Sequence, residues 1–507
     1  MKFDVIVDCY TDEPSGLGVP PYIGVHSRYI AGALKNLNRK YYYVTIDDLR
    51  YAYGERQIGE AFNKRIINTT KNKGNVKEIL ENAENIYLVL GCFVKYDYVS
   101  AVPGTFNEVN KLFNNLIMNK RNNVFLFYSL GGALLSKEKQ NKVIPQGLFK
   151  ETIFGNTYNY FIKNDSNNVF EPNYNLLKNI AIASSSLLEQ LDRPYIFEIE
   201  TATGCNRNPG CTFCIEGKRG LPIQYRDEED IALEIKSLYE KGARYFRLGR
   251  QPNFYAYKER NPKAIEKMFK LIWNYCPEIK TLHIDNAGPQ DVNTEEGEEI
   301  TKLITQYCTD GNIAPFGVES FDPIIREQCN LNGTIEDVFG AIDKINKFGK
   351  IRGKSGMPKL LPGINIIYGL EGQTDKTLEI NLESFEKILN SGNWIRRVFV
   401  RKLTSPYGEQ FDNYTEQNLA EFAMWQSMIN NNFSIPMLRQ VFPDGLEIKH
   451  LRMEMYDGKD SILRQMATCP VRVIIENKKL VLDNFYTVKV KKIIKNRTIL
   501  GEVIESE

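Results

Sequence analysis

The chain has 507 residues, of which 42% are hydrophobic and 25% are charged, a composition typical of soluble globular proteins. This length exceeds one compact core, so roughly two or three domains are expected. The formal charge of +2 excludes a generally basic, nucleic-acid-coating surface but leaves room for a local basic patch. Nine cysteines at irregular spacing do not form a disulfide framework. With no membrane-length apolar run and no signal peptide before the first strand, we expect a reduced, cytoplasmic protein without membrane contact.

Residues 1–190 alternate strand and helix signals, which predicts a doubly wound α/β domain. The strand candidates are residues 3–7, 42–46, 86–90 and 124–128. Between the first two, Gly16, Gly18 and Pro20-Pro21 form a fixed loop before a helix over residues 23–37. Such a loop either binds a ligand at the carboxyl end of a strand or is plain turn chemistry. Residues 136–179, rich in Asn, Lys and Tyr, are interpreted as an irregular connection.

A strand at residues 195–199 leads into a loop that begins at Gly204 and carries Cys205, Cys211 and Cys214. Cysteines at short spacing on a loop after a strand are typical of iron–sulfur sites. A zinc site needs a fourth ligand, and the histidines (His26, His283 and His450) are remote in sequence. A redox Cys-x-x-Cys pair would leave Cys205 unexplained. The single cysteines Cys276, Cys308, Cys329 and Cys469 are interpreted as buried thiols.

Residues 191–435 form a regular strand–helix alternation. Further strands are predicted at residues 245–248, 282–285, 314–320, 363–369 and 398–400, and Asp227, Asn261 and Thr334 begin helices. Six strand–helix units predict a partial TIM-like (βα)6 barrel, in which chemistry gathers at the carboxyl ends of the strands.

Two strands of this alternation carry charges at every second residue. Glu198 and Glu200 share one face, as do His283 and Asp285. These groups either face a substrate in the lumen or form internal ion pairs with Arg247, Arg250 or Arg401.

Residues 464–507 are predicted to form a small β-barrel of short alternating strands, after a linker at residues 436–463. Residues 471–500 contain eight Lys or Arg and two acidic residues, a local excess of 8 − 2 = 6 positive charges. A basic barrel of this kind either contacts an RNA backbone or closes the partial barrel as a solvated lid.

The cysteine segment and three strand ends (LGRQ, GVES and IIYGLEGQT) resemble the radical S-adenosylmethionine superfamily. The superfamily usually spaces its cysteines by three and two residues and ends its second strand Gly-Gly-Glu; here the gaps are five and two, and Gly249-Arg250-Gln251 stands at the strand end. The resemblance implies a [4Fe-4S] cluster on Cys205, Cys211 and Cys214 whose open iron binds S-adenosylmethionine. The cofactor contacts that it implies are Phe213, Gly249, Arg250, Gln251, Glu319, Ser320 and Gly369.

The flanking domains carry weaker resemblances. The N-terminal domain resembles cobalamin-binding and methylthiotransferase domains, but it lacks the Asp-x-His-x-x-Gly pattern, and Cys9 and Cys92 do not complete a second cluster. The C-terminal domain resembles the TRAM domain of RNA-modifying enzymes. The whole chain is similar to an archaeal group of uncharacterised radical S-adenosylmethionine proteins, whose members often continue into a helix-hairpin-helix unit; this chain ends at Glu507 without one.

These resemblances imply an enzyme that reductively cleaves S-adenosylmethionine to a 5′-deoxyadenosyl radical and modifies RNA, with a transfer RNA base as the expected target. Methylthiolation is disfavoured because the second cluster's cysteines are missing. An electron donor such as flavodoxin or ferredoxin is implied. The alternatives are a cobalamin-assisted radical methyltransferase without a protein histidine ligand and a non-enzymatic iron–sulfur RNA-binding protein. The sequence assigns no catalytic residue for the substrate step.

Overall fold

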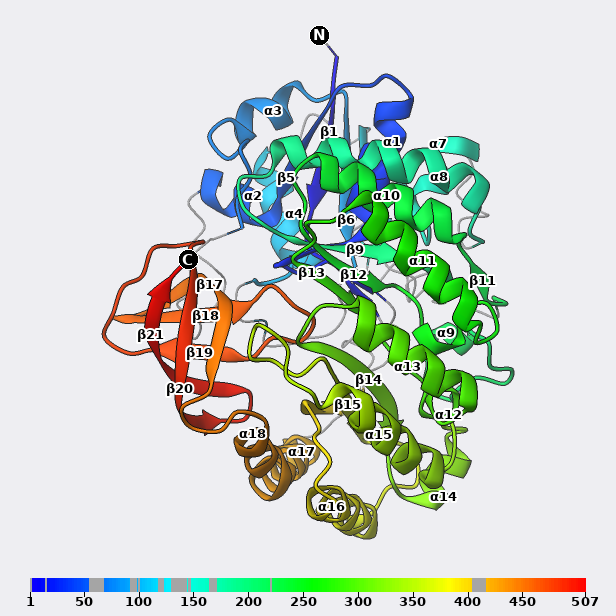
Figure 1. Cartoon of the computed structure of the whole chain (residues 1–507). Helices are drawn as coiled ribbons and strands as arrows, with labels where there is room; N and C mark the ends of the chain where they lie inside the picture. Colours follow the sequence, from blue (N-terminus) through cyan, green and yellow to red (C-terminus); the bar gives the residue numbers. More distant parts are fainter. Residues whose placement is uncertain are drawn as a thin grey trace.

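A computed structural model gives the architecture of the chain (Figure 1). It describes residues 2–13, 16–53, 68–91, 98, 101–116, 123–128, 144, 147–163, 171–218, 221–403 and 416–507. Cys92 and part of the predicted connection at residues 136–179 lie outside the described residues. The N-terminal α/β domain, the partial barrel and the small C-terminal barrel are distinct in Figure 1 and follow one another along the chain.

The N-terminal domain is a parallel sheet in the order β5-β1-β6-β7-β8. Its strands are β1 (Asp4–Asp8), β5 (Tyr41–Thr45), β6 (Asn85–Leu90), β7 (Val124–Tyr128) and β8 (Glu151–Phe154). Its helices are α1 (Val25–Asn36), α2 (Ile46–Tyr53), α3 (Val76–Asn82), α4 (Phe106–Leu116), α7 (Thr157–Lys163), α8 (Tyr174–Ala183) and η3 (Ser184–Gln190). The doubly wound fold is therefore confirmed.

The prediction of an irregular connection at residues 136–179 is wrong for its described part. That part contains β8, α7 and the start of α8. The Asn- and Lys-rich composition hid a sparse apolar pattern, in which Ile153, Tyr158 and Leu177 are buried. A few well-placed apolar residues were enough to form these elements.

The glycine loop between β1 and α1 joins the N-terminal domain to the partial barrel. It contains β2 (Asp12–Glu13), β3 (Gly16–Leu17) and β4 (Tyr22–Ile23). β4 pairs in parallel with β9 (Ile196–Glu200). A Cβ on Gly18 would lie 2.8 Å from Thr11 Oγ1, and one on Gly24 would lie 3.0 Å from Gly18 Cα. These glycines allow close backbone packing, which favours the turn interpretation over a ligand loop.

The partial barrel contains all of the predicted strand–helix units. Its strands are β9, β12 (Tyr245–Gly249), β13 (Thr281–Ile284), β14 (Asn312–Glu319), β15 (Leu360–Tyr368) and β16 (Arg397–Lys402). Sheet β13-β12-β9-β4 and sheet β14-β15-β16 are joined by a bridge between Ala287 and Phe316. The outer helices are α10 (Glu228–Glu240), α11 (Pro262–Tyr275), α13 (Glu295–Tyr307), α15 (Ile335–Gly349), α16 (Asp375–Asn390) and α17 (Glu416–Ile429).

The shorter elements of this part lie in its connections. They are β10 (Ala202–Thr203), α9 (Ile215–Lys218), β11 (Gln224–Tyr225), η4 (Phe254–Ala256), α12 (Pro289–Val292), α14 (Pro323–Gln328), η6 (Asn430–Ser434) and α18 (Ile435–Val441). The predicted helix starts are confirmed, because Asp227, Asn261 and Thr334 each accept a backbone N–H at a helix N-terminus.

A buried arginine fixes the N-terminal domain against the partial barrel. Arg28 of α1 pairs with Glu234 of α10 at 2.7 Å and donates to the carbonyl of Glu198 in β9 at 2.5 Å. Glu234 also accepts from Arg226 at 2.6 Å. Because the charges are buried and paired, the interface has a defined geometry.

The C-terminal domain is a closed barrel in the order β17-β18-β19-β21-β20. Its strands are β17 (Glu447–Asp457), β18 (Asp460–Gln465), β19 (Arg472–Ile475), β20 (Phe485–Lys495) and β21 (Thr498–Ser506). The prediction of a linker at residues 436–463 is wrong, because this segment contains most of α18, all of β17 and part of β18. Bulges between Ile448 and Leu451 and between Met453 and Met455 interrupt the two-residue period that marks a strand.

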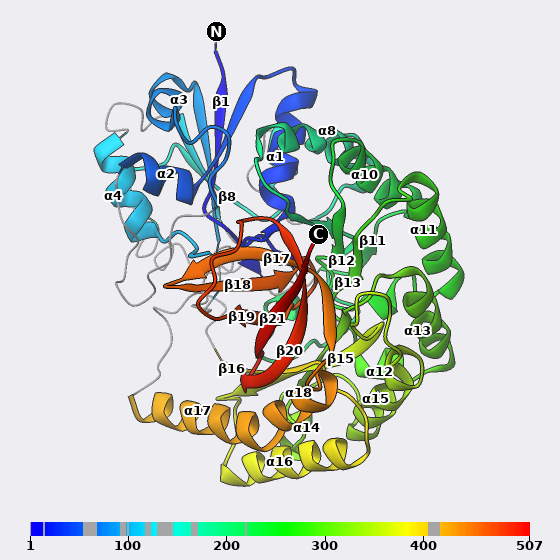
Figure 2. The ribbon, with the colours of Figure 1, turned by 60° about the vertical axis from the view of Figure 1, so that its left-hand side comes forward.

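The small barrel packs against the amino ends of the partial barrel's strands. Thr281 at the start of β13 donates to the carbonyl of Met466 at 2.5 Å, and Arg396, just before β16, donates to the carbonyl of Cys469 at 3.3 Å. In Figure 2 the small barrel lies within the arc formed by the outer helices. It therefore covers the end of the lumen opposite the loop that follows β9. In the part of the chain that the structure describes, no helix is long and apolar enough to cross a membrane.

Candidate active site

The cysteine loop begins directly after β9, at the carboxyl end of the partial barrel. Its base is closed by the antiparallel pair β10–β11 and by a bridge between Cys205 and Pro222. Gly204 has φ +94°, and a Cβ there would lie 2.4 Å from the carbonyl oxygen of Pro222. Only glycine meets both requirements, so Gly204 sets the turn into the cysteines.

The enlarged gap between the first two cysteines is held by side chains that the sequence did not single out. Arg207 donates from Nη1 to Cys211 Sγ at 2.9 Å and from Nη2 to the carbonyl of Asn330 at 2.7 Å. Asn330 in turn donates to the carbonyls of Pro209 at 2.7 Å and Gly210 at 3.0 Å. The insertion is thus packed against the segment after α14.

The three cysteines are free thiols. Burial raises the pKa of Cys211, which Arg207 partly offsets, and raises the pKa of Cys214 to about 12. Thiols in such surroundings become thiolates when cations bind them. Among the described residues, no three His, Cys, Asp or Glu side chains are placed around a single metal ion. Since a [4Fe-4S] cluster binds each cysteine at a different iron, three half-buried thiols on one loop fit a cluster better than a zinc ion.

An apolar wall beneath the loop brings two predicted cofactor contacts together. Phe213 packs with Cys211 against a buried cluster that includes Ile367 and Leu370 at the end of β15. Gly369, between them, has φ +94° and donates its N–H to Gln373 at 2.7 Å. The wall is apolar, as the packing of an adenine ring requires.

The end of β14 carries Glu319 and Ser320. Burial raises the pKa of Glu319 to about 8, although Arg401 and Arg326 lower it. The charge of Glu319 also acts on the pKa of Cys211, so this strand end lies near the cysteine loop. Ser320 is fully buried and its Oγ accepts the N–H of Asp322 at 3.1 Å.

At the end of β12, Arg250 is engaged by two neighbouring side chains. Its Nε pairs with Glu200 at 2.7 Å, and its Nη1 lies 3.0 Å from His26 Nε2. A Cβ on Gly249 would lie 2.0 Å from Glu198 Oε1, so the lack of a side chain there leaves room for the Glu198 carboxylate. Gln251 Oε1 and Glu200 Oε1 are buried acceptors that have no hydrogen-bond partner in the described structure. Two orphaned acceptors at adjacent strand ends fit an ammonium group such as that of S-adenosylmethionine.

Charged side chains inside the barrel form internal ion pairs with arginines. This agrees with the second of the two alternatives given above for these strands. Arg247 pairs with Glu198 at 2.6 Å and also with Asp285. His283 accepts the N–H of Thr468 at Nδ1 at 3.1 Å, and its Nε2 lies 3.1 Å from the carbonyl oxygen of Asp310. Burial lowers the pKa of His283 to about 4. His283 therefore joins the small barrel to β13 as a neutral ring.

A group of arginines surrounds Phe399 on β16. The guanidinium carbons of Arg397, Arg401 and Arg497 lie 4.3, 4.8 and 4.8 Å from the ring centroid. Burial lowers the pKa of Arg397, whereas Arg497 is exposed. Neither Arg397 nor Arg497 forms an ion pair with a residue that the structure describes. Like charges gathered this closely favour a bound anion.

Comparisons with known proteins identify the relatives of this chain. Residues 199–385 match the family model of the radical SAM superfamily. An uncharacterised protein of Methanocaldococcus jannaschii is 34% identical over 534 residues, covering 99% of this chain and 93% of the relative. An uncharacterised protein of Archaeoglobus fulgidus is 33% identical over 485 residues, covering 92% and 84%.

More distant relatives have lower sequence identity, and the alignment covers a smaller share of each relative. A tRNA-2-methylthio-N(6)-dimethylallyladenosine synthase of Lachnoclostridium phytofermentans is 22% identical over 275 residues, covering 53% of this chain and 57% of the relative. A structure of the apo cobalamin-dependent S-adenosylmethionine radical enzyme OxsB superposes with a TM-score of 0.50 at 13% identity, covering 85% of this chain and 55% of that chain. This last similarity concerns the fold alone.

Proposed function

The chain belongs to the radical S-adenosylmethionine superfamily and is an enzyme, and we propose that it modifies RNA, with a base of transfer RNA as the target. In this proposal the enzyme takes one electron from a flavodoxin or ferredoxin and breaks the S–C5′ bond of S-adenosylmethionine. The products are methionine and a 5′-deoxyadenosyl radical, which removes a hydrogen atom from the RNA. Because the superfamily consists of enzymes, this membership argues against the alternative of a non-enzymatic iron–sulfur RNA-binding protein.

The residues of the site divide the work of binding the cofactor. Cys205, Cys211 and Cys214 would hold a [4Fe-4S] cluster, which supplies the electron and an open iron for the methionine end of the cofactor. Gln251 and Glu200 offer acceptors for its ammonium group. This chain's own contribution is to position the cofactor and to exclude side reactions.

The wall beneath the loop supports the adenosine end of the same arrangement. Phe213 and the backbone at Gly369 would contact the adenine, and Glu319 and Ser320 the ribose. Arg250 is engaged with Glu200, so we assign it a positioning role beside His26. His26 is correspondingly engaged, which disfavours it as a cobalamin ligand.

The observation that carries the RNA proposal is the pair of arginines without an ion-pair partner among the described residues, Arg397 and Arg497. They lie around Phe399, on the strand that ends the partial barrel and on the small barrel beside it. Guanidinium groups bind phosphate with paired N–H donors, and an aromatic ring adds a stacking face. The similarity to tRNA-modifying enzymes supports the same class of substrate.

Three measurements test the proposal. After anaerobic reconstitution and reduction, the enzyme is expected to produce 5′-deoxyadenosine from S-adenosylmethionine; an intact cluster without this product would contradict radical chemistry. RNA modification profiles from cells with and without the gene are expected to differ at a transfer RNA base. Arg397→Ala with Arg497→Ala is expected to weaken RNA binding while 5′-deoxyadenosine formation without RNA is kept, and unchanged RNA affinity would contradict the assigned role of the arginines.

A cobalamin-assisted methyltransferase is the second candidate. The observation that favours it is the strand order of the N-terminal sheet, which places a switch point between β1 and β6 where such sheets bind ligands. Cobalamin that stays bound through purification would support this candidate, and a reconstituted protein that retains none would count against it.

A further inference from the structure

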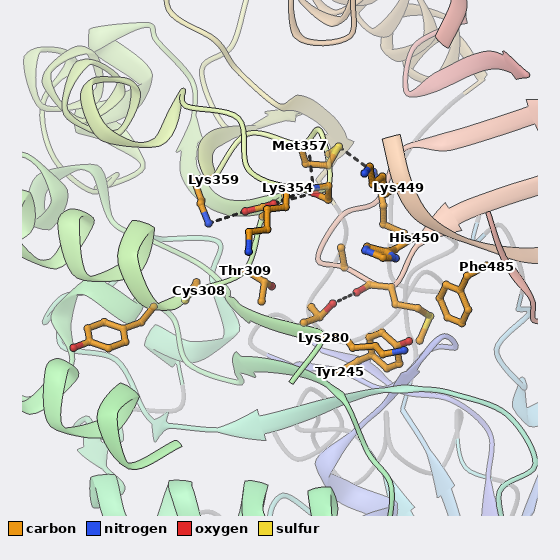
Figure 3. Close-up of a pocket in the computed structure, with 18 of the residues that line it drawn as sticks. Tyr245, Lys280, Cys308, Thr309, Lys354, Met357, Lys359, Lys449, His450 and Phe485 are labelled. Atoms are coloured by element: carbon orange, nitrogen blue, oxygen red, sulfur yellow. Dashed lines mark hydrogen bonds and ion pairs between the residues drawn. The ribbon is translucent and has the colours of Figure 1, made fainter. Parts of the chain in front are cut away.

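A groove lies between the small barrel and the amino ends of the partial barrel's strands, at the opposite end of the lumen from the cysteine loop. It encloses about 810 Å³, within the range of ligand sites in proteins. Figure 3 shows residues of both barrels around it, among them Lys280 and Tyr245 near the amino ends of the partial barrel and His450 and Phe485 of the small barrel. The predicted site does not use this groove.

Three lysines of the groove have no ion-pair partner among the described residues. They are Lys280 before β13, Lys354 before β15 and Lys449 in β17, and all are exposed. The fourth lysine of the lining, Lys359, pairs with Asp310 at 2.8 Å, and Glu507 is the second acid of the lining, so four lysines stand against two carboxylates. The groove therefore carries a net positive charge from three separate segments, and it favours an extended anion over a single small one.

Aromatic side chains form part of the lining. The rings of Tyr245 and Phe485 stack across the domain interface with centroids 6.3 Å apart and planes 9° apart. Trp273 is held by a hydrogen bond of 2.8 Å from its Nε1 to the carbonyl of Tyr307. The amine of Lys280 lies 5.8 Å from the centroid of Phe485. Rigid rings beside unpaired lysines are the combination by which proteins bind bases and phosphates of single strands.

Other contacts account for the docking of the small barrel. Arg193 pairs with Asp483 at 2.8 Å, and Thr281 bonds to the carbonyl of Met466. Within the described residues, none of the three unpaired lysines donates a side-chain hydrogen bond across the interface. The interface thus leaves these cations free to bind something else.

We propose that this groove binds a single-stranded segment of the RNA substrate. The inference rests on the proposed RNA-modifying function and adds a second contact to it. Because the groove and the cysteine loop lie at opposite ends of the lumen, the segment bound here is not the reacting base. The substrate is therefore a folded RNA long enough to reach both ends of the partial barrel, rather than a free nucleotide.

The test compares the reconstituted full-length enzyme with the triple variant K280A/K354A/K449A. Affinity is measured by fluorescence anisotropy for a fluorescein-labelled single-stranded oligoribonucleotide and for unfractionated transfer RNA, over a series of salt concentrations. Loss of three phosphate contacts is expected to weaken binding at least about tenfold, and to make the plot of log affinity against log salt shallower by about 2. The matched control carries Lys35→Ala, Lys263→Ala and Lys387→Ala, which remove exposed lysines outside the groove.

Stacking is tested separately. The unlabelled oligoribonucleotide is expected to quench tryptophan fluorescence in the wild type, and this quenching is expected to disappear in Trp273→Phe, which keeps Trp394 and Trp425. If the quenching in Trp273→Phe equals that in the wild type, the bases do not stack on Trp273 and the groove is not their binding site.

The outcomes separate this inference from the proposed function. If the groove variant binds RNA with wild-type affinity, or if the control variant loses as much affinity, the groove does not bind the RNA. Either result leaves the proposed RNA modification untouched. A wild type that makes 5′-deoxyadenosine but binds neither RNA contradicts the RNA substrate itself. A groove variant that keeps its RNA affinity but is no longer reduced by flavodoxin would show an electron-donor site, which also overturns the inference.

Discussion

Arg207 donates a hydrogen bond of 2.9 Å to the sulfur of Cys211, its neighbour four residues along the loop. The same guanidinium bonds to the carbonyl of Asn330, more than 120 residues away. The enlarged gap between the first two cysteines is thereby tied to the barrel. A cation at this distance favours the thiolate, the form of cysteine that binds iron.

Replacing Arg207 with alanine is expected to weaken the cluster without unfolding the chain. Groups that orient a metal ligand typically contribute about 10- to 100-fold in metal affinity. The measurement is iron content per chain, with the visible absorption of the cluster, during titration with a chelator. Arg439→Ala, at an exposed arginine on α18, is the control and should behave as wild type; equal cluster stability in both variants would refute the role of Arg207.

Replacing Cys211 with alanine is expected to abolish the cluster, since a cubane held by two cysteines loses one of its three protein ligands. Cys276→Ala, at a buried thiol at the end of α11, should keep full iron content. Iron and sulfide are quantified after anaerobic reconstitution. Full iron in the Cys211 variant would overturn the ligand assignment.

The sequence predicted those features that depend on neighbouring residues. Asp227, Asn261 and Thr334 begin helices because their side chains bond to N–H groups two or three residues later. The cysteine loop was found for the same reason, since its three cysteines lie within ten residues. Contacts between residues that are close in sequence leave a pattern that can be recognised in the sequence itself.

Features that depend on distant partners were not predictable in the same way. Asn330 holds the cysteine loop from after α14, and no local signal marks it. Gly249 looked like a place for cofactor approach, but its missing Cβ makes room for Glu198 on the adjacent strand. The start of the small barrel was missed because the bulges in β17 break the alternation. Spatial neighbours, rather than sequence neighbours, decide these points.

The contact between Gly249 and Glu198 gives a prediction about stability. In Gly249→Ala the new Cβ would lie 2.0 Å from Glu198 Oε1, and the carboxylate must leave Arg247 or the N–H of Arg250. Breaking a buried ion pair costs about 3 kcal/mol or more. Urea unfolding should show this loss, whereas Gly74→Ala, which meets no atom within 4 Å, should stay near wild type. A stable Gly249 variant would show that Glu198 has room to move.

The pKa of His283 predicts how acid affects the joint between the two barrels. Burial lowers this pKa from 6.5 to about 4, because the folded chain disfavours the imidazolium. Between these values the unfolded chain binds the proton and the folded chain does not. The contribution of His283 is therefore complete above pH 6.5 and is lost progressively as the pH falls towards 4, with a loss of about 2 kcal/mol at pH 5.

The measurement is the free energy of unfolding at pH 7 and pH 5, in wild type and in His283→Gln. Glutamine also accepts and donates hydrogen bonds but does not titrate, so the variant should lack this part of the acid sensitivity. The accessibility of Thr468, which bonds to His283, should rise in the wild type at pH 5 when followed by amide hydrogen exchange. An identical fall in stability for both proteins would show that other groups govern the acid response of this interface.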